Sequence, residues 1–290
     1  MRVALLGLGL IGGSIARALR ARGPGDWTIA AWTPTGHGPA AALADGVIDD
    51  AAATPEAAVA GAGLVVLAGP VPDCLAMLDE LAGPWGTALD PDAVITDVAS
   101  TKADLVLRAT ALGVRFVGGH PMAGRESSGY EAASADLFVD RPWVIIPSAD
   151  ATAAARVEDL ARAVGARPIR MTAADHDAAV AGISHLPLVV AAALVEAVAG
   201  GAGEPRPGWG AAADLAASGW RDTTRLARGD VTMGTGIAVT NGPAIAARVR
   251  DLVAVLDAWA ALLETPGGVD RTEVTERLTA ARERLEAMGT

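Results

Sequence analysis

The sequence predicts an α/β fold, in which an N-terminal doubly wound, mostly parallel sheet precedes an all-helical C-terminal domain. Three observations predict this class. Short apolar runs alternate with helical patterns from the N-terminus to about Met171. A glycine-rich turn over residues 7–12 separates the first apolar run from the first helical pattern. Every periodic segment after Met171 is helical, so we predict domains at residues 1–171 and 172–290.

The N-terminal half alternates strands with helices. Its first unit is a strand at residues 2–6, the glycine turn and a helix to about Arg22. Further strands are predicted at residues 27–32, 64–67, 94–96, 115–117, 143–146 and 168–171. Helices are predicted at residues 73–81, 102–112 and 151–164. We expect all of these strands to form one mostly parallel sheet, with an antiparallel edge strand compatible with this fold near its end.

The C-terminal half reads as a series of helices. Thr172 and Asp175 match a capping box at its start, and Pro187 is predicted to break the first helix near Ser184. Further helices are predicted at residues 211–228, 241–264 and 272–288. The most apolar window, residues 178–200, contains polar residues and a proline, so we expect a buried core helix rather than a membrane span. Because this half is so apolar, we expect a homodimer that buries part of it.

Composition restricts the kind of partner. The formal net charge of −11 argues against a nucleic-acid-binding face and against an anionic membrane surface. Cys74 is the only cysteine, so no intrachain disulfide can form, and a reducing, cytoplasmic compartment is expected. The N-terminus lacks the pattern of a signal peptide. An anionic small molecule would need locally positive side chains to bind a chain of this charge.

The glycine turn predicts a dinucleotide-binding site. Gly7 permits the tight turn, Gly9 lets the backbone approach a pyrophosphate, and Gly12 lets the helix pack on the strand. The order of strand, glycine turn and helix favours a Rossmann-type domain over an ordinary turn. Thr33 stands where NAD-selective sites have an acidic residue, and no arginine follows it, so the sequence leaves NAD and NADP open. The predicted cofactor-binding residues are Gly7, Gly9, Leu10, Ile11, Gly12, Thr33, Pro70 and Ser100.

Two stretches at the carboxyl ends of later strands hold reactive or hydrogen-bonding side chains. Residues 118–129 place His120 between glycines and a proline, which hold an imidazole still in a loop. Ser100 opens a helix at the same edge of the sheet, either as its N-cap or as a hydrogen-bond partner of the imidazole. Lys102 is either a solvated side chain or a contact for a phosphate or carboxylate.

The helical half adds a second set of polar residues. Asp222 lies three residues before Arg225, and a guanidinium oriented in this way can bind a carboxylate through two hydrogen bonds. The alternative for this pair is a surface ion pair. His176 and His185 are nine residues apart, which places them on opposite faces of a straight helix. We therefore expect no metal site.

Five motifs, in this order, resemble the prephenate/arogenate dehydrogenase family of tyrosine biosynthesis. They are GLGLIGGS at residues 7–14, DVASTK at 97–102, the His120 stretch at 118–129, ISHLP at 183–187 and RDTTR at 221–225. The resemblance covers nearly the whole chain and implies a Rossmann domain followed by a helical dimerisation domain. It implies oxidative decarboxylation of prephenate to 4-hydroxyphenylpyruvate with hydride transfer to NAD or NADP. The motifs do not separate this reaction from the conversion of arogenate to tyrosine.

The resemblance also implies roles for single residues. His120 is expected to be the catalytic histidine that hydrogen-bonds the ring hydroxyl of the substrate, and Ser100 the serine that orients it near the nicotinamide. Arg225 is expected to bind a substrate carboxylate, whereas His185 and Glu126 are expected to line the substrate pocket. No mutase segment or regulatory domain is expected, so the resemblance implies a stand-alone enzyme.

Two other functions compete with this interpretation. A β-hydroxyacid dehydrogenase, which also pairs a Rossmann domain with a helical one, relies on a lysine in the helical domain. Here Lys102 is the only lysine and belongs to the sheet half, which argues against that function. A nucleotide sensor would bind the cofactor but ignore substrate analogues.

Overall fold

A computed structural model describes residues 1–23, 25–125 and 127–289. The chain divides into two compact units, Met1–Ala244 and Ile245–Thr290. The first unit contains the sheet and the first helices that follow it, so this division differs from the predicted domain boundary after residue 171. That boundary marks the change from sheet to helices and stays a prediction.

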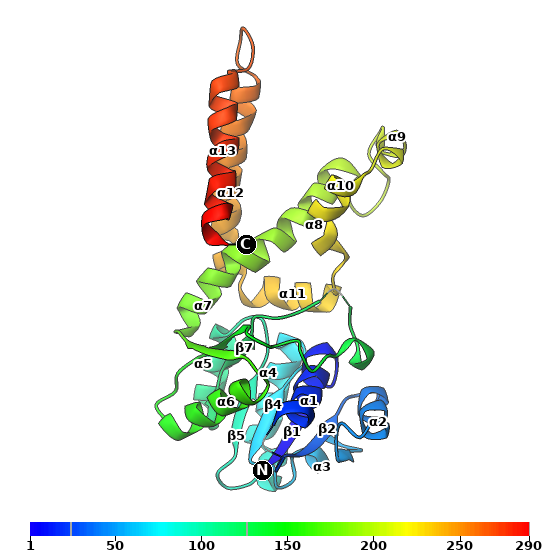
Figure 1. Cartoon of the computed structure of the whole chain (residues 1–290), viewed down its shortest axis with the longest axis vertical. Helices are drawn as coiled ribbons and strands as arrows, with labels where there is room; N and C mark the ends of the chain where they lie inside the picture. The colour runs from blue at the N-terminus through cyan, green and yellow to red at the C-terminus, as the bar shows by residue number, and fades with distance from the viewer. Residues whose placement is uncertain (24, 126, 290) are drawn as a thin grey trace. The chain divides into compact units, whose positions relative to one another are not determined.

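Six parallel strands form the central sheet of the first unit. Figure 1 shows this sheet with the helices around it. Their order is β3-β2-β1-β4-β5-β6, so the direction of winding reverses between β1 and β4. The strands are β1 Arg2–Leu6, β2 Thr28–Trp32, β3 Asp50–Ala51, β4 Leu64–Leu67, β5 Val94–Asp97 and β6 Phe116–Val117. This is the predicted Rossmann-type sheet, with the two-residue strand β3 in addition.

Helices cover both faces of the sheet because successive side chains of a strand point to opposite sides. Val3 and Leu5 of β1 belong to the apolar core on one face, and Leu6 belongs to the core on the other. Helices α1 and α6 contribute to the first core, and α4 and α5 to the second. The helices are α1 Leu10–Arg22, α2 His37–Ala44, α3 Pro55–Val59, α4 Val71–Ala82, η1 Pro84–Ala88, α5 Ala103–Leu112 and α6 Ala151–Ala163.

The last three strands form a sheet of their own, so the prediction that they complete the first sheet is wrong. They are β7 Gly119–Pro121, β8 Pro142–Ile145 and β9 Arg167–Arg170, with β7 antiparallel and β9 parallel to β8. The chain leaves β6 at two glycines. A Cβ atom on Gly119 would lie 2.7 Å from the carbonyl oxygen of Asp97, so only glycine allows this close crossing.

The helical part of the first unit begins as predicted. Thr172 caps α7 by accepting a hydrogen bond of 3.1 Å from the backbone N–H of Asp175. A π-helical turn, η3, precedes Pro187, and the predicted helix over residues 211–228 is broken into three short pieces. These elements are α7 Ala173–Val180, η3 Ala181–His185, α8 Leu186–Val198, α9 Trp209–Asp214, α10 Ser218–Thr223, η4 Arg225–Arg228 and α11 Val231–Thr240.

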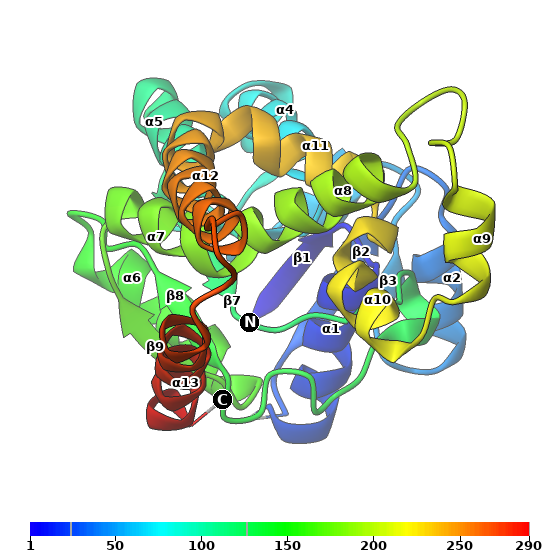
Figure 2. The ribbon, with the colours of Figure 1, turned by 90° about the horizontal axis from the view of Figure 1, so that it is seen from above.

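Helices α7 and α11 anchor the helical part to the carboxyl edge of the six-stranded sheet (Figure 2). The hydroxyls of Thr101, after β5, and Thr240, on α11, are 2.8 Å apart. Gly236 of α11 packs on Pro72 at the start of α4, where a Cβ atom would approach the proline ring to 3.2 Å. The sequence analysis did not predict α11, since its fit depends on this contact between distant segments.

One helical stretch, Ala173–Val198, is long and apolar enough to cross a membrane by length and composition alone. Only 22% of its most apolar window is buried within the single chain, so the prediction of a helix buried in the core of the chain is wrong. His176, Asp177 and His185 lie on its buried face and make hydrogen bonds with protein groups. This pattern is typical of a helix that packs on protein.

The second unit contains α13 Arg271–Met288 and all but the first three residues of α12 Gly242–Leu263. The two helices match the predicted segments 272–288 and 241–264. Asp270 caps α13 through the backbone N–H of Thr272 at 2.8 Å. The guanidinium of Arg277 lies 5.3 Å from the centre of the Trp259 ring. Several apolar side chains of both helices are exposed, including Val253, Leu256, Leu278 and Leu285.

Candidate active site

The candidate site lies at the carboxyl edge of the six-stranded sheet. The segments that follow β1, β4, β5 and β6 all leave the sheet at this edge because these strands are parallel. They carry the glycine turn, Pro70, Ser100 and His120, which the fold therefore brings to one side of the sheet. In open α/β sheets this edge, beside the reversal of strand order, is where ligands bind.

The glycine turn has the geometry that a bound pyrophosphate needs. Gly7 has φ = +111°, and a Cβ atom there would lie 2.5 Å from the carbonyl oxygen of Ala68. A Cβ atom on Gly12 would lie 2.1 Å from the carbonyl oxygen of Gly7, whereas one on Gly9 would meet nothing within 4 Å. Helix α1 starts at Leu10 without a side-chain cap or an acidic residue in its first turn. Its first N–H groups, including that of Ile11, have no acceptor within the helix and suit an anion.

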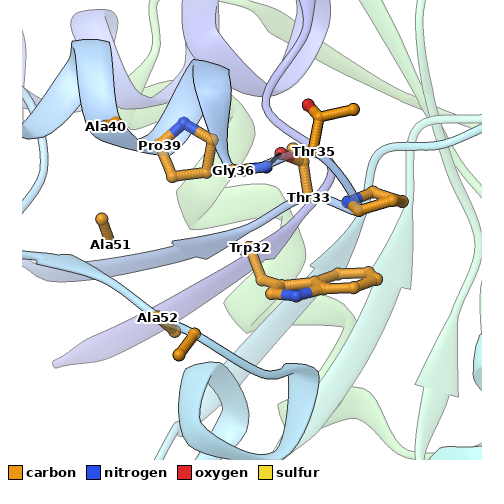
Figure 3. Close-up of a pocket in the computed structure, with 10 residues that line it drawn as sticks. Trp32, Thr33, Thr35, Gly36, Pro39, Ala40, Ala51 and Ala52 are labelled. Atoms are coloured by element: carbon orange, nitrogen blue, oxygen red, sulfur yellow. Dashed lines mark hydrogen bonds between the residues drawn. The ribbon is translucent and has the colours of Figure 1, made fainter.

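A neutral pocket of about 330 Å³ lies beside this turn, at the end of β2 (Figure 3). Trp32, Thr33, Thr35 and Gly36 line it together with alanines from the segment after β3. None of the ten described residues that line the pocket carries a charge. The pocket fits the adenosine end of a dinucleotide, and it offers neither the carboxylate that selects NAD nor the guanidinium that selects NADP.

Ser100 does not cap the helix that follows it. Helix α5 begins at Ala103, and its N-terminal N–H groups are capped by a carboxylate from α7. Asp177 accepts hydrogen bonds of 2.8 Å from the backbone N–H groups of Lys102 and Ala103. The Ser100 side chain is partly exposed and makes no hydrogen bond with the described residues. Its role near the nicotinamide stays a prediction.

Lys102 is neither solvated nor available to a ligand, which corrects both interpretations of it. Its side chain is completely buried and forms an ion pair with the equally buried Asp97. Asp97 also accepts hydrogen bonds from the backbone N–H groups of Ala99, at 2.9 Å, and Gly119, at 3.0 Å. The pair therefore fixes the start of β7, next to His120.

His120 lies in a short strand rather than in the predicted loop. It occupies the middle of β7, opposite Val144 of β8, and its ring is partly exposed. Its Nδ1 atom lies 2.8 Å from Nε2 of His176, so the ring that holds it is another imidazole and not the Ser100 hydroxyl. Burial and the nearby charge of Lys102 hold the pKa of His120 well below its usual range. The ring is therefore neutral at pH 7 and can accept a proton.

Two residues behind His120 were not predicted from the sequence. His176 was considered only as a metal ligand, yet its Nδ1 atom lies 2.7 Å from Oδ1 of Asp177. Although burial raises it, hydrogen bonds from His176 and from the backbone N–H groups of Ala103 and Lys102 lower the pKa of Asp177 overall. The adjacent pair of a histidine and an aspartate at the start of α7 was the signal available in the sequence.

His185 shares the buried side of its helix with His176, so the prediction that the two lie on opposite faces is wrong. The intervening π-helical turn η3 adds one residue to the turn and changes the phase of the helix. Both side chains are 1% exposed. Asn241 connects them, since its amide nitrogen lies 2.9 Å from the carbonyl oxygen of Asp177 and 3.1 Å from Nδ1 of His185. The described residues contain no group of three potential metal ligands.

The remaining two candidates are Arg225 and Glu126. Arg225 starts η4, which packs against α8, and its side chain is exposed within the single chain. Its predicted carboxylate contact, and its orientation by Asp222, stay predictions. Glu126 lies outside the residues that the structure describes.

Comparison with known proteins identifies the family. The family model described as "Prephenate dehydrogenase, nucleotide-binding domain" matches residues 15–170, and "Prephenate dehydrogenase, dimerization domain" matches residues 172–279. This chain belongs to the prephenate dehydrogenase family. The first match starts after the glycine turn, so the pyrophosphate site is supported by the geometry of Gly7, Gly9 and Gly12.

Individual members of the family are similar over most of their length. A prephenate dehydrogenase of Bacillus subtilis is 35% identical over 88% of this chain and 68% of the relative. A cyclohexadienyl dehydrogenase of Zymomonas mobilis is 34% identical over 84% of this chain and 82% of the relative. The crystal structure of Synechocystis arogenate dehydrogenase has 31% identity and a TM-score of 0.79, covering 99% of this chain and 100% of that one.

A solved structure with ligands is similar as well. Prephenate dehydrogenase of A. aeolicus, in complex with hydroxyphenyl propionate and NAD+, has 26% identity and a TM-score of 0.83. It covers 99% of this chain and 96% of that one. The prediction of family and fold from the five motifs is therefore confirmed.

Proposed function

We propose that this chain oxidatively decarboxylates prephenate to 4-hydroxyphenylpyruvate, with hydride transfer to NAD+ or NADP+, in tyrosine biosynthesis. One observation carries the proposal. A neutral, partly exposed His120 lies at the carboxyl edge of a Rossmann sheet that also presents the glycine turn, in a member of this family. The arrangement combines a proton acceptor with a dinucleotide site.

The chemistry needs little more from the protein. The nicotinamide, when bound, accepts the hydride from the carbon that bears the ring hydroxyl. His120 accepts the hydroxyl proton as that carbon becomes a carbonyl. The carboxylate on the opposite ring carbon then leaves as carbon dioxide, because its loss makes the ring aromatic. The chain's remaining task is to hold the substrate in line with the base and the cofactor.

We assign the binding of the substrate to residues of both halves of the chain. Arg225 is proposed to bind a substrate carboxylate, with His185 and Glu126 as further contacts, and Ser100 is proposed to lie near the nicotinamide. The buried and unpaired Nε2 atom of His185 supports its assignment, since none of the described residues offers it a hydrogen bond. In a chain of net charge −11, a local cation such as Arg225 supplies the attraction that a dianion needs.

Arogenate is the second candidate substrate. The similarity to Synechocystis arogenate dehydrogenase and to a cyclohexadienyl dehydrogenase favours including it. A β-hydroxyacid dehydrogenase is not favoured, because Lys102, the only lysine, is sequestered in its ion pair with Asp97. The substrate is thus a cyclohexadienyl acid in either case.

We also propose that the enzyme is a cytoplasmic homodimer assembled through its helical half. The family's dimerization domain covers residues 172–279, and α8, α12 and α13 expose apolar side chains that a second copy would bury. The single cysteine suits a reducing compartment.

A two-by-two activity measurement tests the function. Purified protein is mixed with prephenate or arogenate and with NAD+ or NADP+, and formation of the reduced nicotinamide is followed by absorbance. We expect turnover of prephenate with at least one cofactor. Turnover of arogenate alone would move the assignment to the second candidate, and turnover of neither substrate with either cofactor would refute the proposed function.

A further inference from the structure

Asp177 is the point where the contacts of the buried histidines meet. Its carboxylate accepts hydrogen bonds from the first backbone N–H groups of α5 and contacts Nδ1 of His176. Its backbone carbonyl oxygen is bonded to Asn241, which in turn contacts His185. Asp177 is 5% exposed, and His176 and His185 are each 1% exposed.

We propose that Asp177 is a positioning residue that fixes the tautomers of three histidines, so that His120 presents a proton acceptor to the substrate and His185 presents a donor. The inference deepens the proposed function and rests on it for the identity of the substrate. The tautomers themselves follow from the hydrogen-bond contacts of neutral imidazole rings.

The carboxylate determines the state of His176. Backbone N–H groups only donate, so the two bonds from Lys102 and Ala103 require both carboxylate oxygens of Asp177 to accept. The contact of 2.7 Å between Oδ1 and Nδ1 of His176 is then a bond donated by the ring. A neutral imidazole with its hydrogen on Nδ1 has a lone pair on Nε2.

His176 in turn determines the state of His120. Its Nε2 lone pair lies 2.8 Å from Nδ1 of His120, so the hydrogen of this bond belongs to His120. The other nitrogen of the His120 ring, Nε2, then carries a lone pair. That is the form that accepts a proton from a hydroxyl, and the depressed pKa keeps the ring in it.

Asn241 gives His185 the opposite tautomer. The carbonyl oxygen of Asp177 only accepts, so the atom of Asn241 that reaches it must be the amide nitrogen. The second hydrogen of this amide points to Nδ1 of His185, at 3.1 Å, which therefore accepts. The ring hydrogen of neutral His185 lies on Nε2, a buried atom without a hydrogen-bond partner among the described residues.

An unpaired buried donor is costly, so its presence points to a ligand that supplies the acceptor. An oxygen of the substrate, from a carboxylate or a ketone, has the right chemistry. Burial lowers the pKa of His185 to about 4, against the attraction of Asp177, so the ring donates as a neutral group.

The test that does not depend on activity is the nitrogen NMR spectrum of histidine side chains in the full chain. The chain has four histidines, and His37→Gln identifies the signals of the exposed one. We expect His120 and His176 to carry hydrogen on Nδ1, and His185 on Nε2. Hydrogen on Nε2 of His120 in the unmodified protein would overturn the inference, whatever the enzyme's substrate.

Asp177→Leu is the decisive variant, because it removes the acceptor for Nδ1 of His176. The hydrogen of that ring is then no longer held on Nδ1, and its shift to Nε2 moves the hydrogen of His120 to its own Nε2. We expect the signals of both rings to change accordingly and kcat to fall on the order of 10²–10⁴-fold, as for other bases held in the wrong tautomer. Asn241→Leu is expected to change the His185 signals and leave those of His120 unchanged. Unchanged signals in Asp177→Leu would overturn the inference.

A matched pair at His176 covers the case in which Asp177→Leu does not fold. Glutamine is long enough to place a carbonyl oxygen where Nε2 lies, so His176→Gln preserves the acceptor for His120 and His176→Leu removes it. We expect the glutamine variant to retain at least about tenfold more kcat than the leucine variant. Val180→Ala loosens the same buried helix without touching a polar group, and is expected to stay within about threefold of the original kcat. A loss in Val180→Ala equal to that in His176→Leu would show a merely structural role.

Discussion

Single residues of the glycine turn show how sequence and site are connected. Gly7, Gly9 and Gly12 form one motif, but the structure gives each a different reason to be glycine. At Gly7 and Gly12 the missing Cβ atom lets backbone approach backbone, whereas a Cβ atom on Gly9 would meet nothing within 4 Å. The sequence predicted this division of roles, because the order of strand, turn and helix fixes the geometry locally.

We expect alanine at these positions to separate stability from cofactor binding. In Gly12→Ala the new methyl would lie 2.1 Å from the Gly7 carbonyl oxygen, so both the melting temperature and cofactor affinity should fall. Gly9→Ala has room in the folded protein and should keep its melting temperature while losing affinity for NAD+ or NADP+. Thermal unfolding and a fluorescence titration measure the two effects, and equal melting temperatures for the two variants would contradict the account.

A second prediction at this scale concerns the buried ion pair. Removing one partner leaves an uncompensated buried charge, so Lys102→Met should cost about 3–5 kcal/mol of unfolding free energy. The exposed pair of Arg108 and Asp79 is the control, since Arg108→Met should cost about 0–1 kcal/mol. Urea unfolding of the two variants compares them, and a similar cost for both would show that the Asp97 pair does not hold the site.

At the scale of elements, the sequence predicted what local pattern determines and missed what distant contacts determine. The strands of the main sheet and the cap of Thr172 on α7 follow from nearby residues, and both are present. The cap of α5 comes from Asp177, 74 residues along the chain from Ala103, so the residues just before the helix could not reveal it. The π-helical turn η3 also could not be predicted from nearby residues. It changes the phase of the helix, so His185 lies on the same face as His176.

The π-helical turn makes stability depend on pH through His185. The pKa of His185 is about 4 in the folded chain and about 6.5 in the unfolded chain. The contribution of the neutral ring to the free energy of unfolding is therefore fully present above pH 6.5 and is lost as pH falls toward 4. Between pH 7.5 and 4.5 the loss amounts to about 2–3 kcal/mol for this residue. Urea unfolding should show a smaller loss over that range in His185→Gln than in the original chain. Identical losses would contradict a buried, neutral His185.

On the scale of the whole molecule, the helical half exposes more apolar surface than a single chain explains. Leu278 and Leu285 of α13 are 59% and 57% exposed. We expect sedimentation to give a mass of about two 29.1 kDa chains. Leu278→Asp with Leu285→Asp should shift it toward one chain, whereas Leu107→Asp, at a 71% exposed position on α5, should not. A monomeric original chain would refute the proposed homodimer.

The central claim is that the neutral His120 ring takes the hydroxyl proton of the substrate. His120→Asn tests it most directly when kcat and the Kd of the cofactor are measured on the same preparation, with His37→Asn as the control on an exposed histidine. We predict that kcat falls on the order of 10²–10⁴-fold while cofactor affinity stays within about threefold. A variant that turns over its substrate at close to the original rate would contradict the account.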